Sequence, residues 1–420
     1  MTAGENGTAM PRNTRRLRRR ALPVLAATGA WAVCLMGAAP AAVAEDVQSR
    51  QWYLDSMQAE DMWKASTGKG IKVAVVDSGV DPSTPSLRGQ VLPGKDLTGA
   101  DGGAHDDYDG HGTTMAELIA GTGNGGGLKG LAPGAKVVPF RTALSDLEGA
   151  EGSTADKAVR AAANSDAQVI NMSFGSEYIS QKLHSAIDYA VSKGKLLIAG
   201  TGNDGAGKNR PFYPAGYPEV IGVGSVDAQG KVSNFSGYGN HVSVVAPGSD
   251  IPRWCDKNLK KYCDGDGGTS AATAIASASA ALIWSKHPEW NANQVARVLV
   301  GTTDGVMEKR DPSKYVGYGA VRPRLNLLEG KGEPGNPKQP AFLDNGDFDT
   351  SKAAFSAAPA KGGSSDDGKS GSGKGDAGAD DAMAKSSSDD NSTLWTSLGI
   401  AAAVIVLGGG AFAFMRARRG

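Results

Sequence analysis

Ser270 lies where a serine could act as a nucleophile. It follows a glycine-rich segment and opens a run of small residues, "TSAATAIASASAALIW" (269–284), which predicts a deeply buried helix. A serine at a helix start is often a cap, whose hydroxyl accepts a hydrogen bond from a free backbone N–H group. It can also be a nucleophile, because the free N–H groups and the positive end of the helix dipole would stabilise an oxyanion. The second role requires a base and an acid that orients the base.

Asp77 and His111 are candidates for that acid and that base. The run "IKVAVVD" (71–77) is rich in Val and Ile and predicts a buried parallel strand. This strand ends in Asp77, at the sheet edge where α/β proteins bind ligands. His111 stands between two glycines at the start of a predicted helix. Structural roles are the alternatives: Asp77 could cap the next turn, and a lone histidine is more often structural than catalytic.

Asn203 lies in the glycine-rich loop "AGTGNDG" (199–205), which follows another predicted strand. Asparagine is common in turns, where its side chain bonds to the nearby backbone. At the end of a strand it could instead donate its side-chain amide to an oxyanion. The sequence leaves both roles open at this residue.

Strands and helices alternate along the chain between and beyond these residues. The predicted strands are 71–77, 135–141, 167–175, 195–205 (with its loop), 220–227 and 241–248, and the predicted helices include 156–165, 180–194 and those that begin near 111 and 269. This alternation indicates an α/β domain with a mostly parallel sheet and helices on both faces.

Four segments carry a family resemblance: "VAVVDSGVD", "DGHGT", "AGTGN" and "GGTSAATA". In this order they resemble the subtilisin-like serine proteases (subtilases, peptidase S8), over about residues 50–330. The order Asp, His, Ser along the chain is that of subtilisin. The resemblance implies a single subtilisin-like globular domain and serine endopeptidase activity. We expect no cofactor and no metal ion at the site, and the sequence leaves structural calcium sites open.

The resemblance also implies a role for each residue of the motifs. Asp77 would orient His111, which would accept the proton of Ser270, and the oxyanion would bind to Asn203 and the Ser270 N–H group. Ser173, Phe174 and Gly175 resemble the strand that pairs with the substrate backbone and forms one wall of the first specificity pocket, and Gly200, Thr201 and Gly202 resemble the other wall.

Phe212 falls where the floor of this pocket is often glycine in the family. A phenyl ring there would fill the pocket, because packed proteins leave few voids. The pocket would then prefer small P1 residues, such as Ala or Ser, over Phe or Tyr. The alternative is that the loop turns Phe212 into the core beside Tyr213, because aromatic residues usually find burial.

Three residues of the motifs depart from the usual family pattern. Ala274 replaces a proline, Thr114 replaces a histidine and Glu117 replaces a glycine. None of the three carries out chemistry, so we expect changed packing rather than lost activity. The sequence offers no physical account of Glu117.

The composition suits one large globular domain, or two small ones, with appendages. Of the 420 residues, 40% are hydrophobic and 21% are charged. The 44 basic residues equal the 44 acidic ones in number, and arginines concentrate near the two ends of the chain. The remainder is therefore net acidic, which argues against a nucleic-acid partner.

Both ends of the chain carry targeting features. "RRLRRR" (15–20), the apolar stretch after it and "AVA" (42–44) predict a secretory signal peptide, with an uncleaved anchor as the alternative. The uncharged segment 394–415 would span about 33 Å as a membrane helix, with a buried core helix as the alternative. The expected organisation is a signal peptide (1–44), an N-terminal arm (45–70), a catalytic domain (71–330), a disordered linker (331–393), a transmembrane helix (394–415) and a cytoplasmic tail (416–420).

Cys255 and Cys263 bracket a short polar loop in the exported part, whereas Cys34 lies in the signal segment. An oxidising compartment would favour a disulfide between Cys255 and Cys263. Closing so short a loop would contribute roughly 2–3 kcal/mol. Two free thiols are the alternative.

The segment "QWYLDSMQAEDMWKASTGKG" (51–70) resembles the N-terminal arm of the mycosins, the membrane-anchored subtilases of type VII secretion systems. The features expected at the two ends match that architecture. The resemblance implies a cell-membrane protein with its catalytic domain outside, a protein or peptide substrate, and secretion-complex subunits as partners. Two functions stay open: a serine endopeptidase, and a structural subunit that stabilises the complex while proteolysis is dispensable.

Overall fold

The computed structural model describes residues 47–143, 153–265, 267–303 and 312–340, which all belong to one compact unit. The predicted signal peptide, membrane helix and cytoplasmic tail lie outside the described residues, as does the predicted linker beyond residue 340. Within the described ranges, no helix combines the length and the apolar character that crossing a membrane requires.

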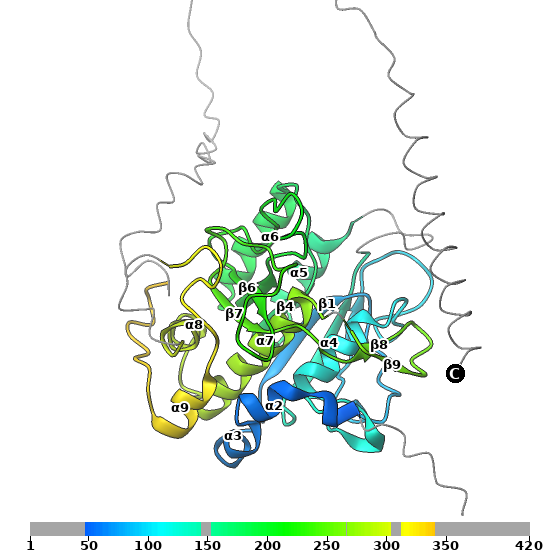
Figure 1. Ribbon diagram of the computed structural model, residues 1–420. Coiled ribbons are helices and arrows are strands. Elements are labelled where there is room, and N and C mark those ends of the chain that lie inside the picture. The colour runs from blue at the N-terminus through cyan, green and yellow to red at the C-terminus, as the bar shows by residue number, and fades with distance from the viewer. Residues whose placement is uncertain (1–46, 144–152, 266, 304–311, 341–420) are drawn as a thin grey trace, which may run out of the picture. The chain divides into compact units, whose positions relative to one another are not determined.

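A seven-stranded sheet forms the centre of the domain (Figure 1). Its strands lie in the order β2-β3-β1-β4-β5-β6-β7, and each strand is parallel to the strands beside it. The strand bounds are β1 Lys72–Asp77, β2 Lys95–Asp96, β3 Lys136–Arg141, β4 Val169–Met172, β5 Leu196–Gly200, β6 Ile221–Val226 and β7 Val244–Pro247. The six strands predicted from apolar runs are confirmed, because strands covered on both faces are apolar throughout.

Helices cover both faces of this sheet. Val73 and Val75 of β1 face one core, and Ala74 and Val76 face the other. The first core is shared with α4 (His111–Ala120), α7 (Thr269–Lys286), α8 (Ala292–Gly301) and α9 (Pro323–Glu329), and the second with α5 (Ala155–Ala163) and α6 (Gln181–Ser192). The predicted α/β fold is therefore confirmed.

Helix α7 is buried on all sides along most of its length. Every residue from Ala271 to Trp284 is buried, and the helix contacts β1, β4, β5, β6 and β7. Small side chains are needed here because neighbouring elements approach the helix from every direction. The run of Ala, Ser and Thr after Ser270 is explained by this position.

The N-terminal arm is part of the same domain. It forms the short helices η1 (Val47–Arg50), α2 (Trp52–Ser56) and α3 (Ala59–Ala65). The indole N–H group of Trp52 donates to the carbonyl oxygen of Ser249 at 3.1 Å, and the Ser66 hydroxyl donates to that of Leu282 on α7 at 2.8 Å. The arm is therefore hydrogen-bonded to segments that lie some 200 residues further along the chain.

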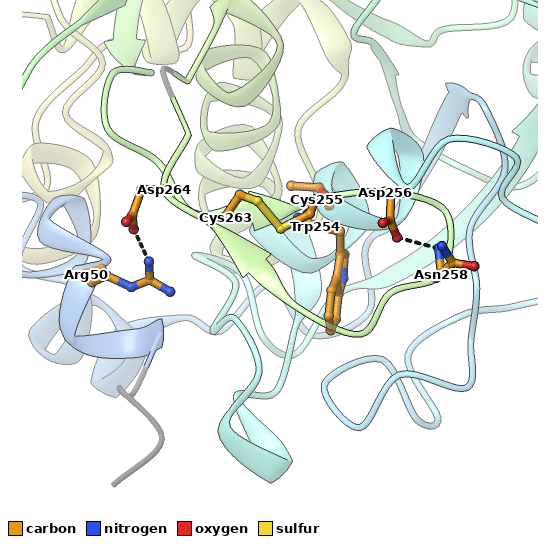
Figure 2. The surroundings of a disulfide bond; sticks show 8 residues. Arg50, Trp254, Cys255, Asp256, Asn258, Cys263 and Asp264 are labelled. Carbon is orange, nitrogen blue, oxygen red and sulfur yellow. Dashed lines mark hydrogen bonds and ion pairs between the residues drawn. A yellow bond between two sulfur atoms is a disulfide. The ribbon is translucent and has the colours of Figure 1, made fainter. Parts of the chain in front are cut away.

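A small antiparallel hairpin, which the sequence analysis did not predict, precedes α7. Its strands are β8 (Arg253–Trp254) and β9 (Tyr262–Cys263). Two-residue strands are too short for a periodic pattern to show in the sequence. The sulfur atoms of Cys255 and Cys263 lie at disulfide-bonding distance within it (Figure 2). A short 3-10 helix, η2 (Asn124–Gly126), completes the described elements.

Candidate active site

The predicted site residues meet at the carboxyl edge of the parallel sheet. Asp77 ends β1, Ser173 follows β4, and Asn203 lies in the loop after β5. These three strands are adjacent in the sheet. His111 begins α4 and Ser270 lies in the first turn of α7, so two helix starts face the same edge.

Asp77 and His111 are joined by a hydrogen bond of 2.7 Å between Oδ1 of the aspartate and Nδ1 of the imidazole. Asp77 is fully buried, whereas the His111 side chain is 30% exposed. The backbone N–H group of Ser78 also donates to Oδ1 at 2.8 Å, and the Ser78 hydroxyl, whose single proton is shared with Asp107, lies 3.2 Å from Oδ1. Because Nδ1 is bound to the aspartate, Nε2 of His111 is the nitrogen left for proton transfer.

The pKa of His111 is shifted by two opposing effects. Burial of the imidazole acts to lower the pKa, but the charge and hydrogen bond of Asp77 raise it, and so do the charges of Asp109 and Asp107. The interactions with the three carboxylates together outweigh the effect of burial, and the pKa is raised from 6.5 to about 9. The imidazole of His111 therefore holds its proton more strongly than a free histidine does.

Asp107 fixes the loop before His111 and was not singled out from the sequence. Its carboxylate accepts hydrogen bonds from the Ser78 hydroxyl at 2.8 Å, the Gly110 N–H group at 2.8 Å and the Thr113 N–H group at 2.8 Å. One side chain thus ties the residue after Asp77 to both sides of His111. Its position four residues before a histidine that opens a helix is the signal that could have found it.

Ser270 is half-buried and contacts the end of β4. Its hydroxyl donates to the carbonyl oxygen of Ser173 at 3.3 Å, and the Ser173 hydroxyl donates to the carbonyl oxygen of Ser270 at 3.1 Å. Among the described side chains, no hydrogen bond joins Ser270 directly to His111. In sites without substrate such bonds are often long and tighten only when the substrate binds.

Asn203 is oriented by Thr269, a second residue to which the sequence analysis gave no role. The Asn203 amide oxygen accepts hydrogen bonds from the N–H group and the hydroxyl of Thr269, at 2.9 and 3.0 Å. The amide nitrogen therefore points away from Thr269 and is free to donate to a ligand. A cavity of about 610 Å³ borders Asn203, and Ser233, Phe235 and Asp250 also line it.

The Phe212 ring lies between the two glycines expected on opposite walls of a specificity pocket. A Cβ atom on Gly175 would overlap the ring, and one on Gly202 would lie 2.9 Å from Cγ of the ring. Tyr213, the next residue, packs against the core shared with α5 and α6, and Phe212 is partly buried outside that core. A role for the Phe212 ring as the floor of a specificity pocket stays a prediction.

The other predicted wall residues differ in the contacts that they make. Gly200 packs closely on Thr269, where an added Cβ would lie 2.9 Å from the hydroxyl. The Thr201 hydroxyl is buried and donates to the carbonyl oxygens of Val223 and Gly237. Thr201 can therefore offer only its backbone to a substrate. Phe174 packs partly against the core shared with α5 and α6.

One group of potential metal ligands lies outside these residues. His184 and Asp188 on α6 and Glu219 before β6 have ligand atoms within 4.8 Å of one another. The two carboxylates are exposed, and Nε2 of His184 lies 3.5 Å from Glu219 and 3.9 Å from Asp188. A histidine paired with two surface carboxylates accounts for this group. The expectation that the protein uses no metal ion and no cofactor stays a prediction.

Comparisons with known proteins agree with this geometry. The model of the subtilase family matches residues 68–319. The chain belongs to the subtilase family. It is 37% identical over 240 residues to the major intracellular serine protease of Bacillus subtilis, an alignment that covers 56% of this chain and 74% of that protein. It is 34% identical over 259 residues to thermitase of Thermoactinomyces vulgaris, covering 61% of this chain and 90% of thermitase.

Solved structures of mycosins are similar to this subtilase. MycP1 from Mycobacterium smegmatis superposes with a TM-score of 0.57 at 28% identity, covering 69% of this chain and 87% of MycP1. The MycP3 protease from the type VII (ESX-3) secretion system superposes with a TM-score of 0.58 at 28% identity, covering 68% of this chain and 90% of MycP3. The chain is therefore a subtilisin-like serine protease that resembles the mycosins.

The raised pKa of His111 predicts that kcat/KM of this subtilase rises with pH at an unusually high pH. A histidine that acts as a base must be neutral, so kcat/KM should rise with pH as the imidazole loses its proton. Since Asp77 raises the pKa to about 9, the midpoint should lie well above 6.5. Asp109→Asn should lower the midpoint by a few tenths of a pH unit, since Asp109 is exposed and screened.

The control for this prediction is Asp188→Asn, which removes an exposed carboxylate whose charge is not among those that act on His111. It should leave the midpoint unchanged. The measurement is kcat/KM for a peptide substrate between pH 5 and 10, at about 0.05 and 0.5 M salt. A wild-type midpoint at or below 6.5 would contradict the prediction.

Proposed function

We propose that this protein is a serine endopeptidase in which Asp77, His111 and Ser270 act as a catalytic triad. The observation that carries the proposal is the 2.7 Å hydrogen bond between Asp77 and His111, made at the sheet edge where the first turn of α7 also lies. A buried carboxylate bound to Nδ1 of a histidine leaves Nε2 facing outward as a base. Membership of the subtilase family supports the same assignment.

The chemistry follows from these groups. The Ser270 hydroxyl oxygen attacks the scissile carbonyl carbon while its proton passes to Nε2 of His111. The Asp77 carboxylate stabilises the imidazolium that forms, and Asn203 Nδ2 together with the Ser270 N–H group donates to the oxyanion. His111 then gives the proton to the leaving amine, and a water molecule hydrolyses the acyl-enzyme by the reverse sequence of transfers.

Substrate recognition is proposed to use the two walls around Phe212. An extended peptide would pair with the backbone of Ser173–Gly175, and Gly200–Gly202 would form the opposite wall of the first specificity pocket. With the Phe212 ring between the glycines of both walls, the space for a P1 side chain is short. Two backbone hydrogen bonds, of 2.9 and 2.8 Å, between Ser176 and Tyr213 join the segment that carries Phe212 to the end of the first wall. We therefore infer a preference for small P1 residues.

The cellular setting is proposed from the ends of the chain and the structural relatives. The similar protease MycP3 comes from a type VII secretion system. We infer that this chain is likewise a component of such a system, exported by residues 1–44 and attached to the cell membrane by residues 394–415. A disulfide between Cys255 and Cys263 would suit an extracellular domain.

A structural role in the secretion complex is the second candidate function. It is favoured by two features of the site: the Phe212 ring occupies the pocket, and the Ser270 hydroxyl is bound to Ser173. A site in this state could hold its fold without turning over substrate. The two functions differ in whether Ser270 reacts.

Ser270→Ala should abolish peptide hydrolysis and labelling by a fluorophosphonate probe, because the attacking oxygen is removed. Asn203→Ala should lower kcat by about 10²–10³, the loss found when the corresponding donor is removed from subtilisin, a relative. Ser279→Ala, which removes a buried hydroxyl elsewhere on α7, is the control and should still label. A correctly folded wild-type protein that never labels would favour the structural role.

Phe212→Gly should increase cleavage after Phe and Tyr relative to cleavage after Ala, because the pocket between Gly175 and Gly202 would be emptied. A buried aromatic side chain in a pocket is worth roughly 2–3 kcal/mol, so the ratio of kcat/KM values should change by about 30-fold or more. A peptide library measures this. Tyr178→Gly, a substitution of an exposed aromatic residue, is the control. Wild-type cleavage that is equal or better after aromatic residues would refute the proposed preference.

Deletion of residues 394–420 should release the protease domain into the medium, because the proposed membrane helix is lost. The measurement is the distribution of the protein between membrane and medium fractions, detected by antibody. A chain with residues 416–420 alone deleted should stay in the membrane fraction. Membrane retention of the longer deletion would show that another attachment exists.

A further inference from the structure

Two residues of the His111 helix contact the same small hairpin. They are Thr114 and Glu117, which lie one and two turns along α4 from His111. The hairpin consists of residues 253–263, carries β8 and β9, and contains the sulfur pair of Cys255 and Cys263 (Figure 2). We call it the cysteine hairpin.

Glu117 is completely buried and is hydrogen-bonded through both carboxylate oxygens. Oε1 accepts from the Thr84 hydroxyl at 2.9 Å, and Oε2 accepts from the Tyr262 hydroxyl at 2.8 Å. Burial raises the pKa of the carboxyl group to about 7, against the effect of these hydrogen bonds. Burying a carboxylate is costly unless hydrogen bonds compensate it, so Glu117 depends on Tyr262 of the cysteine hairpin.

Thr114 supplies a second contact, closer to His111. Its hydroxyl oxygen accepts a hydrogen bond from the backbone N–H group of Trp254 at 3.1 Å and donates to the carbonyl oxygen of Gly110 at 2.8 Å. Trp254 and Tyr262 lie directly opposite each other in the hairpin, and their rings stack with centroids 3.8 Å apart. The two residues that bind α4 therefore form one rigid pair.

The turn of the hairpin reaches the residue that precedes His111. Gly110 has a φ angle of +91°, and a Cβ atom there would lie 2.7 Å from the carbonyl oxygen of Asp256. The Asp256 side chain accepts a hydrogen bond from the Asn258 N–H group at 2.8 Å, which orders this turn (Figure 2). The hairpin thus lies along α4 from Gly110 to Glu117.

We propose that Glu117 is a positioning residue that, through Tyr262, fixes α4 to the cysteine hairpin and so holds His111 in place between Asp77 and Ser270. The inference rests on the proposed function, because it concerns the placement of the proposed base. Glu117 itself lies six residues from His111, about 9 Å along the helix axis, and takes no part in the chemistry. A displacement of about 1 Å at a catalytic group can cost as much as 100-fold in rate, so a remote contact of this kind can control turnover.

The position of the hairpin in the chain strengthens this inference. Thr269, which orients Asn203, is the sixth residue after Cys263, and Ser270 follows it directly. Arg50 of the N-terminal arm forms an ion pair with Asp264, directly after the hairpin (Figure 2). The cysteine hairpin therefore connects the helix that carries the proposed base to the segment that leads to the proposed nucleophile.

The test compares two variants of equal size, Glu117→Leu and Glu117→Gln. Leucine makes no hydrogen bond and leaves the Tyr262 hydroxyl without its acceptor, whereas glutamine can accept from Tyr262 and donate to Thr84. Glu117→Leu should lower kcat and the rate of fluorophosphonate labelling by ~10-fold or more, with KM changed by no more than about twofold. Glu117→Gln should restore both rates to within about threefold of the wild type. Wild-type labelling by Glu117→Leu would overturn the proposal, as would a loss in Glu117→Gln equal to that in Glu117→Leu.

A second pair of variants tests the route through the hairpin. Tyr262→Phe keeps the ring stack on Trp254 and removes only the hydroxyl, so it should lower kcat in the same way as Glu117→Leu. In the double variant the two losses should not add, because both variants break one contact. Additive losses would overturn the proposed route. Tyr189→Phe, which removes a tyrosine hydroxyl on α6, is the matched control.

Hydrogen exchange separates a failure of this inference from a failure of the proposed function. Amide protection in α4 can be measured in the full chain whether or not the protein hydrolyses peptides. Glu117→Leu should lower protection in residues 111–120 relative to Glu117→Gln, with protection in α5 unchanged. Unchanged protection in α4 would overturn the inference. A wild type that never labels, yet shows the loss of protection, would instead refute proteolysis and keep the contact.

Discussion

The burial of α7 along most of its length is the constraint on which the rest of the domain depends. This helix contacts five strands of one sheet, and its many Ala, Ser and Thr residues let those strands approach it closely. The N-terminus of α7 lies at the carboxyl edge of the sheet. Thr269 and Ser270 reach the ends of β4 and β5 because the helix behind them cannot shift without creating overlaps in the core.

The charge of Asp77 is the second condition that the fold must meet. A fully buried carboxylate is costly, and the surroundings compensate it with His111, the Ser78 N–H group and the Ser78 hydroxyl. Asp107 in turn binds the Ser78 hydroxyl and the loop before His111. The hydrogen bonds that stabilise the buried charge are therefore the same ones that determine where the imidazole lies. The Asp107 carboxylate, which holds the loop, also raises the pKa of His111, so a rigid loop and a readily deprotonated base oppose each other.

Local patterns predicted the sheet and the residues at its edge, because each strand is a short apolar run and each candidate residue closes such a run or opens a helix. They could not predict contacts made between segments distant in sequence. Tyr262 and Glu117 are 145 residues apart, and nothing near either of them in the sequence indicates the other. Phe212 illustrates the same limit: its neighbours leave two orientations open, and only the closeness of Gly175 and Gly202 distinguishes them. The role of Thr269 depends on Asn203, which lies 66 residues earlier, and nothing near either residue in the sequence indicates the other.

Two of the three residues at which this chain departs from the subtilase pattern share a physical explanation. Each meets a complementary group in the structure: Glu117 meets the hydroxyls of Thr84 and Tyr262, and Thr114 meets the N–H group of Trp254. A larger polar side chain inside a packed helix interface is tolerated only when its hydrogen bonds are satisfied there. Glycine at position 117 would need no partner, so the glutamate and the hairpin tyrosine must be understood together.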